Sequence, residues 1–305
     1  MDIKMKVRGG LGNQLFQYAF AKKLSKKYVD AKISMDISYF NKKHIRNLEI
    51  SKLKLDPKIC FNNHENKLIS FLYLLYRIID RIYSKFVHDE FKQPLILLKF
   101  GLWFSGKEFS CDNIKVLFGK IYLCGYFQNV CEIDEVRSEI RREVLNSISD
   151  DVDYYLKEIM NGTECLGVSI RCGDDYEKFG WPICTREYYI NAIKQMVMKY
   201  HCKTVFIFAD NIHKVMNENW FSNFQNLDIV YVENLTVIES LQLLAMCSYH
   251  IISNSTFAWW GAYLSDDEKQ IVSPKFFYPG IEMKNTGLAM KNMIYLDNFT
   301  GEENT

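Results

Sequence analysis

The chain has 305 residues, of which 48% are hydrophobic, and this is enough apolar material for two globular cores. Its 38 basic and 37 acidic residues leave a net charge of +1, which gives no argument for nucleic acid or an acidic polymer as a partner. The nine cysteines form no CxxC pair, which argues against a disulfide scaffold or a zinc ribbon and favours reduced thiols in a cytoplasmic protein.

The first predicted unit is a strand, a glycine-rich loop, a helix and a second strand. The loop begins the stretch VRGGLGNQLFQYAFAKKLS (7–25), in which apolar residues then recur at helical spacing. The second strand lies in AKISMDIS (31–38) and ends at Asp36. The opposite side of the predicted helix is basic, with Lys22, Lys23, Lys26 and Lys27.

The loop itself has the composition of a binding site. Gly9, Gly10 and Gly12 leave the backbone with little side-chain cover, so another molecule can approach the main chain closely. Asn13 and Gln14 then place amide donors and acceptors at the start of the helix.

Residues 40–120 read as helical and irregular, with few signals. Their most apolar part, LISFLYLLYRIIDRIYSKF (68–86), has an uninterrupted apolar run of only nine residues when Ser70 is counted. That is too short to span a bilayer, which needs about 20 apolar residues. Two interpretations remain: a core or interface helix, or a helix that lies on a membrane surface beside Arg77 and Arg81.

Strand character returns at 120–128, followed by an amphipathic helix at 133–145. From residue 164 onward, apolar β-branched strands alternate with amphipathic helices and end in a last short strand at 269–274. This alternation predicts a parallel sheet covered on both faces, with ligands bound beyond the carboxyl ends of the strands. We therefore expect domains at 1–150 and 151–305, with the option that the C-terminal tail packs back on the first domain.

Polar residues follow three predicted strands, in SIRCGDDY (169–176), FADN (208–211) and SNSTFAWWG (253–261). In the third stretch, Asn254, Ser255 and Thr256 precede a predicted helix, and residues of these types are preferred N-caps. The unpaired N–H groups of a helix N-terminus also hold phosphate, so this stretch is either a capping sequence or a phosphate site.

The other two stretches carry charged residues. Arg171 follows the first strand, and arginine is suited to bidentate contact with phosphate. Asp174 lies three residues on and either forms a structural ion pair with Arg171 or orients it for a ligand. Asp210 ends the second strand, where its carboxylate either accepts from a ring N–H or a ribose hydroxyl, or caps the next helix.

Other templates fit poorly. GGLGNQ is not GxGxxG, because Gln14 and Leu15 occupy the positions where the last glycine could fall, and this argues against a dinucleotide-dependent oxidoreductase. DVD (151–153) matches the DxD metal signature of some glycosyltransferases, but it begins a predicted helix, where acidic residues favour the macrodipole.

Together these stretches resemble one family, the bacterial α-1,2-fucosyltransferases of glycosyltransferase family 11. GGLGNQLFQYA (9–19) is similar to the family's first motif nearly residue for residue. The other motifs follow in order and spacing: GYFQ (125–128), CTREYY (184–189), FIFAD (206–210) and SNSTFAWWGAYLS (253–265). The resemblance covers most of the chain and is weakest over 40–120.

The resemblance implies an α/β, GT-B-like fold in which two Rossmann-like domains face a cleft, an acceptor-side domain followed by a GDP-sugar-binding domain. It implies an inverting transfer of L-fucose from GDP-β-L-fucose to the 2-hydroxyl of a terminal galactoside. The family generally needs no metal, so no cofactor is expected. The implied setting is the bacterial cytoplasm, where a lipid-linked O-antigen or capsule intermediate lies at the inner face of the membrane and the 68–86 helix contacts that surface.

The resemblance also assigns roles to residues. Arg171 is expected to meet the diphosphate, and Asn13 and Gln14 are expected to bind sugar hydroxyls. Asp36 is one candidate for the general base, and a dissociative path with little need for a strong base is the other possibility. The remaining GDP-fucose-binding set is Gly10, Gly12, Ser169, Asp174, Asp210, Asn254, Ser255 and Thr256.

One motif departs from the family pattern. Where the family usually carries HxRRxD, this chain has Ser169, Arg171, Cys172 and Asp174, so the histidine and the second arginine are replaced. Two alternatives follow: a transferase for another GDP-sugar or acceptor, and a non-catalytic protein that binds a nucleotide sugar.

Overall fold

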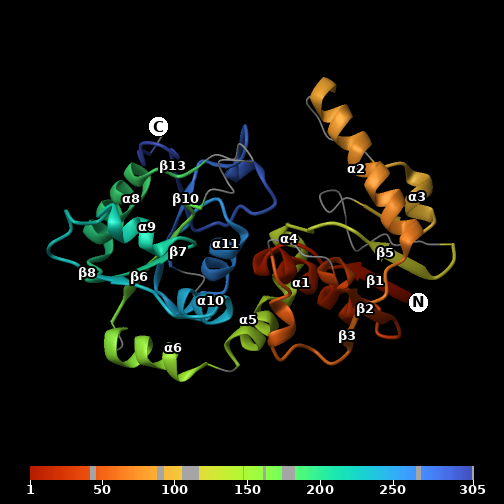
Figure 1. The fold of residues 1–305 in the computed structure, drawn as a ribbon, viewed down its shortest axis with the longest axis horizontal. Helices are drawn as coiled ribbons and strands as arrows, with labels where there is room; N and C mark the ends of the chain where they lie inside the picture. Colours follow the sequence, from red (N-terminus) through yellow and green to blue (C-terminus); the bar gives the residue numbers. More distant parts are fainter. Residues whose placement is uncertain are drawn as a thin grey trace. The chain divides into compact units, whose positions relative to one another are not determined.

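The protein divides into two compact units, Met1–Glu143 and Val144–Thr305, each with its own parallel sheet (Figure 1). The computed structural model describes residues 1–41, 46–87, 93–104, 117–146, 148–160, 163–173, 183–265 and 269–303. The division falls inside helix α5 (Arg137–Leu145), ahead of the boundary predicted between residues 150 and 151.

The first unit has a five-stranded sheet in the order β3-β2-β1-β5-β4, with every pair parallel. Its strands are β1 (Asp2–Lys6), β2 (Lys32–Asp36), β3 (Ile59–Asn62), β4 (Leu102–Trp103) and β5 (Lys120–Leu123). Its helices are α1 (Leu11–Lys27), α2 (Lys67–Val87), α3 (Leu95–Lys99), α4 (Val130–Ile133) and α5, with 3-10 turns η1 (Ser38–Asn41), η2 (Ile50–Lys52) and η4 (Asp134–Val136). The predicted strand–loop–helix–strand opening is confirmed.

The sequence reading missed the two edge strands of this sheet. β4 has only two residues, and β3 exposes both Cys60 and Phe61, so neither shows the alternation that marks a strand. Both lie in the 40–120 region, where the pattern was weakest.

The second unit has a six-stranded sheet in the order β13-β10-β9-β6-β7-β8, again with every pair parallel. Its strands are β6 (Cys165–Ile170), β7 (Thr204–Ala209), β8 (Asp228–Tyr231), β9 (Tyr249–Ile251), β10 (Ile271–Pro274) and β13 (Met293–Leu296). The main helices are α6 (Asp150–Tyr154), α8 (Arg186–Tyr200), α9 (Ile212–Asn217), α10 (Val237–Met246) and α11 (Thr256–Tyr263). A π-helical turn η5 (Tyr155–Met160), a hairpin of β11 (Phe276–Tyr278) and β12 (Ile281–Glu282), and the 3-10 turn η6 (Met283–Asn285) complete it.

The predicted alternation of strands and helices is confirmed from β6 to β10, but β10 is not the last strand. A hairpin and a 3-10 turn connect β10 to β13, with no α-helix between them. The alternation of strand and helix that predicted the other strands therefore ends at β10 and does not predict β13. β13 pairs in parallel with β10 and forms the edge of the sheet.

Alternate residues of β6 enter two cores on opposite faces of its sheet. Leu166, Val168 and Ile170 pack with residues of α8, whereas Cys165 packs with residues of α10. A strand buried on both faces explains why CLGVSI lacks the hydrophobic alternation of a half-exposed strand.

The C-terminal segment packs on its own unit. The Thr185 hydroxyl donates to the Phe299 carbonyl, and the Asn191 side chain donates to the Thr300 carbonyl at 2.7 Å. The Gln195 side chain reaches the Gly301 carbonyl in the same way. In the described residues, therefore, the tail docks on α8 and its N-cap.

The basic side of α1 is solvated only in part, because Lys22 is buried whereas Lys26 and Lys27 are exposed. Lys22 is 3% exposed, and its ammonium contacts Glu143 at 2.6 Å, Asp56 at 3.2 Å and Glu139 at 3.3 Å. Burial alone lowers the pKa of Lys22, but the hydrogen bonds and charges of Glu143 and Asp56 outweigh it and raise that pKa. This network ties α1 to α5 and to the segment before β3.

Helix α2 confirms the predicted helix at 68–86, and one face of it is a core face. Ile69, Tyr73 and Tyr76 pack with Phe104 and Cys124. Among the residues that the structure describes, no helix combines the length and apolar character needed to cross a bilayer.

Replacing Lys22 by methionine should lower the free energy of unfolding by about 3 kcal/mol at pH 7, because three partly buried carboxylates lose their shared partner. The matched Lys26→Met change should cost less than about 1 kcal/mol, since Lys26 is 47% exposed in its pair with Glu139. Urea denaturation measures both values, and equal losses in the two variants would contradict the assignment.

The pH dependence has a definite sign. Lys26 and, less strongly, Lys22 lower the pKa of Glu139 from its ordinary 4.5. A lowered pKa stabilises the fold above the unfolded value, and this contribution is lost as pH falls through the folded value. The difference between wild type and Lys22→Met should therefore shrink below about pH 4.5.

Candidate functional site

In both sheets, the strand order reverses beside the first strand. In the first unit the chain adds β2 and β3 to one side of β1 and later places β5 on the other side. In the second unit it adds β7 and β8 to one side of β6 and then places β9 on the other. Ligands of open α/β sheets bind at such switch points, beyond the carboxyl ends of the strands.

The glycine loop lies at the carboxyl end of β1. Gly9 has a φ of 85°, and a Cβ there would stand 2.7 Å from the Asn13 side-chain nitrogen. Gly10 is the N-cap residue of α1 and has no side chain to cap it, and Gly12 lies buried in the first turn. The Asn13 side-chain oxygen accepts from Gln128 at 2.8 Å, so its amide is held in one orientation beside the loop.

Gln14 holds the protein together, which corrects the prediction that its amide binds a sugar. It is 0% exposed. Its nitrogen donates to the carbonyls of Gly9 and Asn47 at 2.8 Å each, and its oxygen accepts from the backbone N–H groups of Glu49 and Ile50 at 3.0 Å each. Two donors and two acceptors exhaust a glutamine side chain, so nothing is left for a ligand.

Two residues at this switch point escaped the sequence reading. The Gln17 oxygen accepts from the Arg8 backbone N–H at 3.1 Å, and its nitrogen donates to the Gly125 carbonyl at 3.0 Å, so it joins the ends of β1 and β5. The Arg8 guanidinium stands over the rings of Tyr73 and Tyr126, at 4.7 and 4.5 Å. A second glutamine on the buried side of the helix was the available signal for Gln17, whereas nothing local predicted the two rings.

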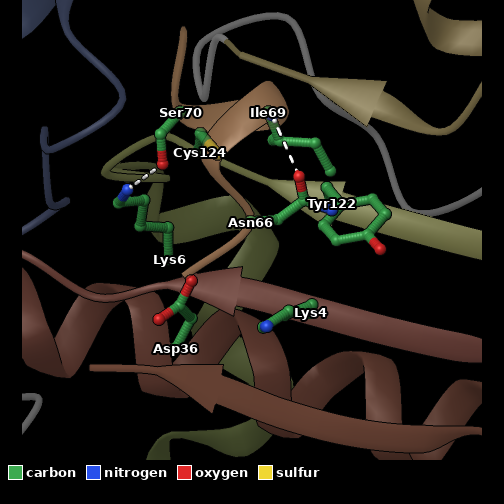
Figure 2. Close-up of a pocket in the computed structure, with 8 residues that line it drawn as sticks. All are labelled: Lys4, Lys6, Asp36, Asn66, Ile69, Ser70, Tyr122 and Cys124. Carbon is green, nitrogen blue, oxygen red and sulfur yellow. Dashed lines mark hydrogen bonds between the residues drawn. The ribbon is translucent and has the colours of Figure 1, made fainter. Parts of the chain in front are cut away.

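Asp36 ends β2 and lines a small pocket between the sheet and α2 (Figure 2). Its carboxylate is 5% exposed, and one oxygen accepts from the Ser38 N–H at 3.0 Å. Lys6 lies opposite it in register on β1 and donates to the Ser70 hydroxyl at 2.7 Å. The remaining lining residues are Lys4, Asn66, Ile69, Tyr122 and Cys124.

At the switch point of the second unit, Asp210 positions Arg171. The Arg171 Nη1 contacts the Asp210 Oδ2 at 2.9 Å, with 13% and 22% of the two side chains exposed. The same carboxylate accepts from the N–H groups of Cys172 at 2.8 Å and Gly173 at 3.1 Å. Asp210 thus binds three donors of its own chain, and the alternative that it caps the next helix is wrong, whereas its acceptance from a ring N–H or a ribose hydroxyl stays a prediction. The cap of α9 is Asn211.

The partner predicted for Arg171 was Asp174, which lies outside the described residues. Cys172, in the position of the family's second arginine, lies with its sulfur 3.6 Å from the Asn211 carbonyl oxygen. Burial and, less strongly, the Asp210 charge raise the pKa of Cys172 to about 11. A raised pKa favours the protonated thiol at neutral pH, which is a weak nucleophile.

The stretch after β9 leaves a helix start open. Ser255 is the N-cap residue of α11, but in the described structure its hydroxyl makes no capping hydrogen bond. Ser253 and Asn254 are each 1% exposed, and the Ser253 hydroxyl has no hydrogen-bond partner among the described residues. A buried hydroxyl without a partner is costly, which favours a polar ligand here over plain capping. Thr256 is partly exposed in the first turn.

Ser169 does not share this access. It lies within β6, in register with Phe208 of β7, and is 4% exposed. Its side chain is therefore shielded from solvent, and its contact with GDP-fucose stays a prediction.

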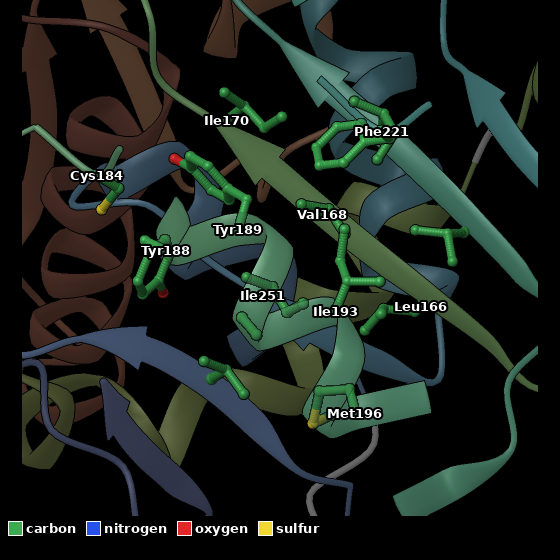
Figure 3. Close-up of a cluster of buried hydrophobic side chains, with 14 of the residues drawn as sticks. Leu166, Val168, Ile170, Cys184, Tyr188, Tyr189, Ile193, Met196, Phe221 and Ile251 are labelled. Atoms are coloured by element: carbon green, nitrogen blue, oxygen red, sulfur yellow. The ribbon is translucent and has the colours of Figure 1, made fainter. Parts of the chain in front are cut away.

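Two tyrosines of α8, Tyr188 and Tyr189, lie in the buried core of this unit (Figure 3) and bond to the backbone just after β6 and β9. The Tyr189 hydroxyl accepts from the Arg171 backbone N–H at 3.4 Å, and the Tyr188 hydroxyl donates to the Ile252 carbonyl at 2.8 Å. Both rings are fully buried, and burial raises the pKa of each hydroxyl well above its ordinary value, so both remain donors and acceptors without charge. The CTREYY stretch was the signal for them.

The DVD stretch begins α6, as expected. Ser149 caps this helix by accepting from the Val152 N–H, and Asp153 pairs with Lys157 one turn on. Within the described residues, no three His, Cys, Asp or Glu side chains are grouped as metal ligands.

A comparison with protein families identifies the family of this chain. Residues 2–303 match the family described as Glycosyl transferase family 11. The chain belongs to glycosyl transferase family 11, and it is therefore a glycosyltransferase. The glycine-loop motif (9–19) and the motif that contains α11 (253–265) both lie within the matched region.

Two curated Escherichia coli proteins are similar to this family 11 chain. The O-antigen biosynthesis glycosyltransferase WbnK is 29% identical over 302 residues, which cover 89% of this chain and 93% of WbnK. An alpha-1,2-colitosyltransferase is 26% identical over 275 residues, which cover 86% of this chain and 87% of that protein.

Two solved structures show the fold of this family 11 chain. Fucosyltransferase NodZ from Bradyrhizobium matches with a TM-score of 0.52 at 14% identity, over 87% of this chain and 93% of NodZ. POFUT1, solved in complex with GDP, matches with a TM-score of 0.50 at 12% identity, over 89% of this chain and 97% of that one. With two parallel-sheet units, these matches confirm the predicted GT-B-like α/β fold.

Alanine at position 9 should be more damaging than alanine at Gly119. Both glycines have a positive φ, of 85° and 63°, but the space around Gly119 is open. We expect Gly119→Ala to lower the free energy of unfolding by about 1 kcal/mol through backbone strain alone. Gly9→Ala should cost at least about 2 kcal/mol, because its Cβ also displaces Asn13. Equal costs in urea denaturation would show that Asn13 is not held against Gly9.

Proposed function

We propose that this family 11 enzyme transfers L-fucose from GDP-β-L-fucose to the 2-hydroxyl of a terminal galactoside, with inversion and an α-1,2 linkage. The observation that carries the proposal is the Arg171 guanidinium, held by Asp210 at a sheet switch point in the same unit as the open start of α11. Such a group matches the diphosphate of a nucleotide sugar. The fucosyltransferase names of the structural neighbours support the sugar.

The chemistry follows from the leaving group. Breaking the bond between fucose and phosphate leaves negative charge on GDP, and fixed donors stabilise it best. Arg171 supplies guanidinium N–H groups, and the start of α11 supplies the Thr256 backbone N–H and the Ser255 hydroxyl, since the Ser255 N–H is bonded to the Ser253 carbonyl. We propose that these donors replace a metal ion in this role. The sugar passes through an oxocarbenium-like state, as in glycoside chemistry generally.

The glycine loop of the first unit is proposed to bind the sugar end of the donor. Gly10 and Gly12 leave the backbone accessible at the start of α1, and the orientation of Asn13 is set by Gln128. The Asn13 amide is the group available for sugar hydroxyls now that Gln14 is fully engaged within the protein. Asp36 is kept as the candidate general base, with a dissociative path as the alternative.

The setting is proposed from the curated relatives. The name of WbnK points to an O-antigen, so the acceptor is proposed to be a lipid-linked, galactose-terminated oligosaccharide at the inner face of the cytoplasmic membrane. The colitosyltransferase favours a second donor, GDP-colitose. Colitose is L-fucose without its 3-hydroxyl, so the two donors differ by one hydrogen-bonding group.

Arg171→Ala should reduce transfer by about 10²–10³-fold, because a fixed donor to the leaving group is lost. The assay follows transfer from GDP-fucose to lacto-N-biose, N-acetyllactosamine and lactose with EDTA present, and the product linkage is identified. Arg141→Ala removes an exposed arginine of α5 and should leave the rate unchanged. Turnover only with GDP-colitose or GDP-mannose would overturn the donor, and GDP binding without transfer would favour a non-catalytic protein.

Asn13→Ala should lower kcat by about 10²-fold, since a sugar that is no longer oriented reacts more slowly. Asn191→Ala is the matched control, because that amide holds the C-terminal tail at the Thr300 carbonyl. Steady-state kinetics with GDP-fucose and lactose separate kcat from KM. Unchanged turnover in Asn13→Ala would exclude this residue from the reaction.

A further inference from the structure

Helix α2 exposes a row of large apolar side chains that its unit leaves uncovered. We call these nine residues, each between 38% and 81% exposed, the apolar stripe: Leu68, Phe71, Leu74, Leu75, Ile78, Ile79, Ile82, Tyr83 and Phe86. A monomeric protein rarely exposes a contiguous apolar surface of this size without a partner.

The stripe is one continuous face of the helix. Its members recur at intervals of three and four residues, so they share one side of a helix about 30 Å long. The opposite side carries Ile69, Tyr73 and Tyr76, which pack in the core of the unit. The helix thus has two apolar faces, and its C-terminal half extends beyond the sheet (Figure 1).

A basic flank borders the stripe. By helical position, Lys67, Arg77 and Arg81 lie along one side of it, and all three are exposed. Arg77 is steadied by the Tyr73 hydroxyl at 3.3 Å, and this bond raises the pKa of the guanidinium further. The one acidic residue of α2, Asp80, lies by helical position on the core-facing side rather than in the basic flank.

The neighbouring segment adds to this surface. Leu97 of α3 packs into the same core as Tyr73, which places α3 beside α2. The other large apolar residues here are exposed by 46–74%: Leu95, Ile96, Phe100, Leu117 and Phe118. The rings of Phe100 and Phe118 stack at 5.9 Å.

This combination fits an anionic bilayer better than a second copy of the chain. An amphipathic helix with an apolar face and adjacent Lys and Arg binds in the interface of anionic lipids, which supply opposite charge along its whole length. A second copy would bring the same basic flank and no acidic row to pair with it.

We propose that the apolar stripe and basic flank of α2, together with α3, bind the surface of an anionic membrane. The proposal rests on the proposed function, because a lipid-linked acceptor would require the enzyme at that surface. The stripe enters the acyl boundary, and Lys67, Arg77 and Arg81 bind lipid phosphates.

The test uses the full chain and vesicles of phosphatidylethanolamine with phosphatidylglycerol, compared with vesicles of phosphatidylcholine. The stripe variant is Leu75→Glu, Ile79→Glu and Ile82→Glu together. The control variant is Val29→Glu, Met198→Glu and Phe299→Glu, which adds the same charge at residues that are 79%, 77% and 59% exposed elsewhere. We expect the stripe variant to bind anionic vesicles at least tenfold more weakly than wild type, and the control to bind like wild type.

Three results would overturn the proposal. They are failure of wild type to bind anionic vesicles, equal binding of the stripe and control variants, and a vesicle-free dimer that only the stripe variant dissociates, which would assign the face to a second copy. Transfer to soluble lactose is measured in parallel and should be equal in all three proteins. If wild type binds vesicles but transfers nothing to any soluble galactoside, the proposed function fails and the membrane site stands.

Discussion

In each unit, the chain returns to place a later strand on the other side of the first strand. The candidate sites of both units depend on this topology. Once β5 lies beside β1, and β9 beside β6, the loops after each pair leave in opposite directions and the sheet edge opens between them. Arg8 and the glycine loop follow β1, and Arg171 follows β6. The candidate residues are thus concentrated by topology rather than by closeness in sequence.

The sequence predicted those parts of the fold in which a long periodic pattern repeats. The alternation from β6 to β10 and the loop before α1 were readable because each strand or helix carries many residues of one pattern. β4 and β13 were not readable, since a two-residue edge strand and a strand reached through a hairpin carry no such pattern. Arg8 between two tyrosines depends on contacts 65 and 118 positions apart in the chain (73 − 8 and 126 − 8), which no local motif records.

The prediction of the site was weakest where a polar residue had two possible uses. Gln14 and Asp210 were assigned to ligands because they stand in glycine-loop and strand-end positions. Instead, each forms hydrogen bonds with the backbone. Gln14 bonds to the 47–50 segment, and Asp210 accepts from the N–H groups of Cys172 and Gly173 after Arg171. A motif residue of this kind matters to function through the position of its neighbours, and a sequence alone does not separate that role from direct contact.

The pairing of Arg171 with Asp210 also determines how Arg171 would stabilise the diphosphate leaving group in the proposed reaction. The carboxylate offsets much of the arginine's charge, so attraction between net charges contributes little to holding a diphosphate. What the pair provides is a guanidinium fixed by an ion pair in a site where Arg171 is only 13% exposed. Donors that are already oriented need not reorganise when charge develops on the leaving group, and in a partly water-excluded site each is worth more than in solution. The open first turn of α11 adds oriented N–H groups that also carry no full charge. In the proposed reaction, stabilisation of the leaving group thus rests on preorganised direction rather than on excess positive charge.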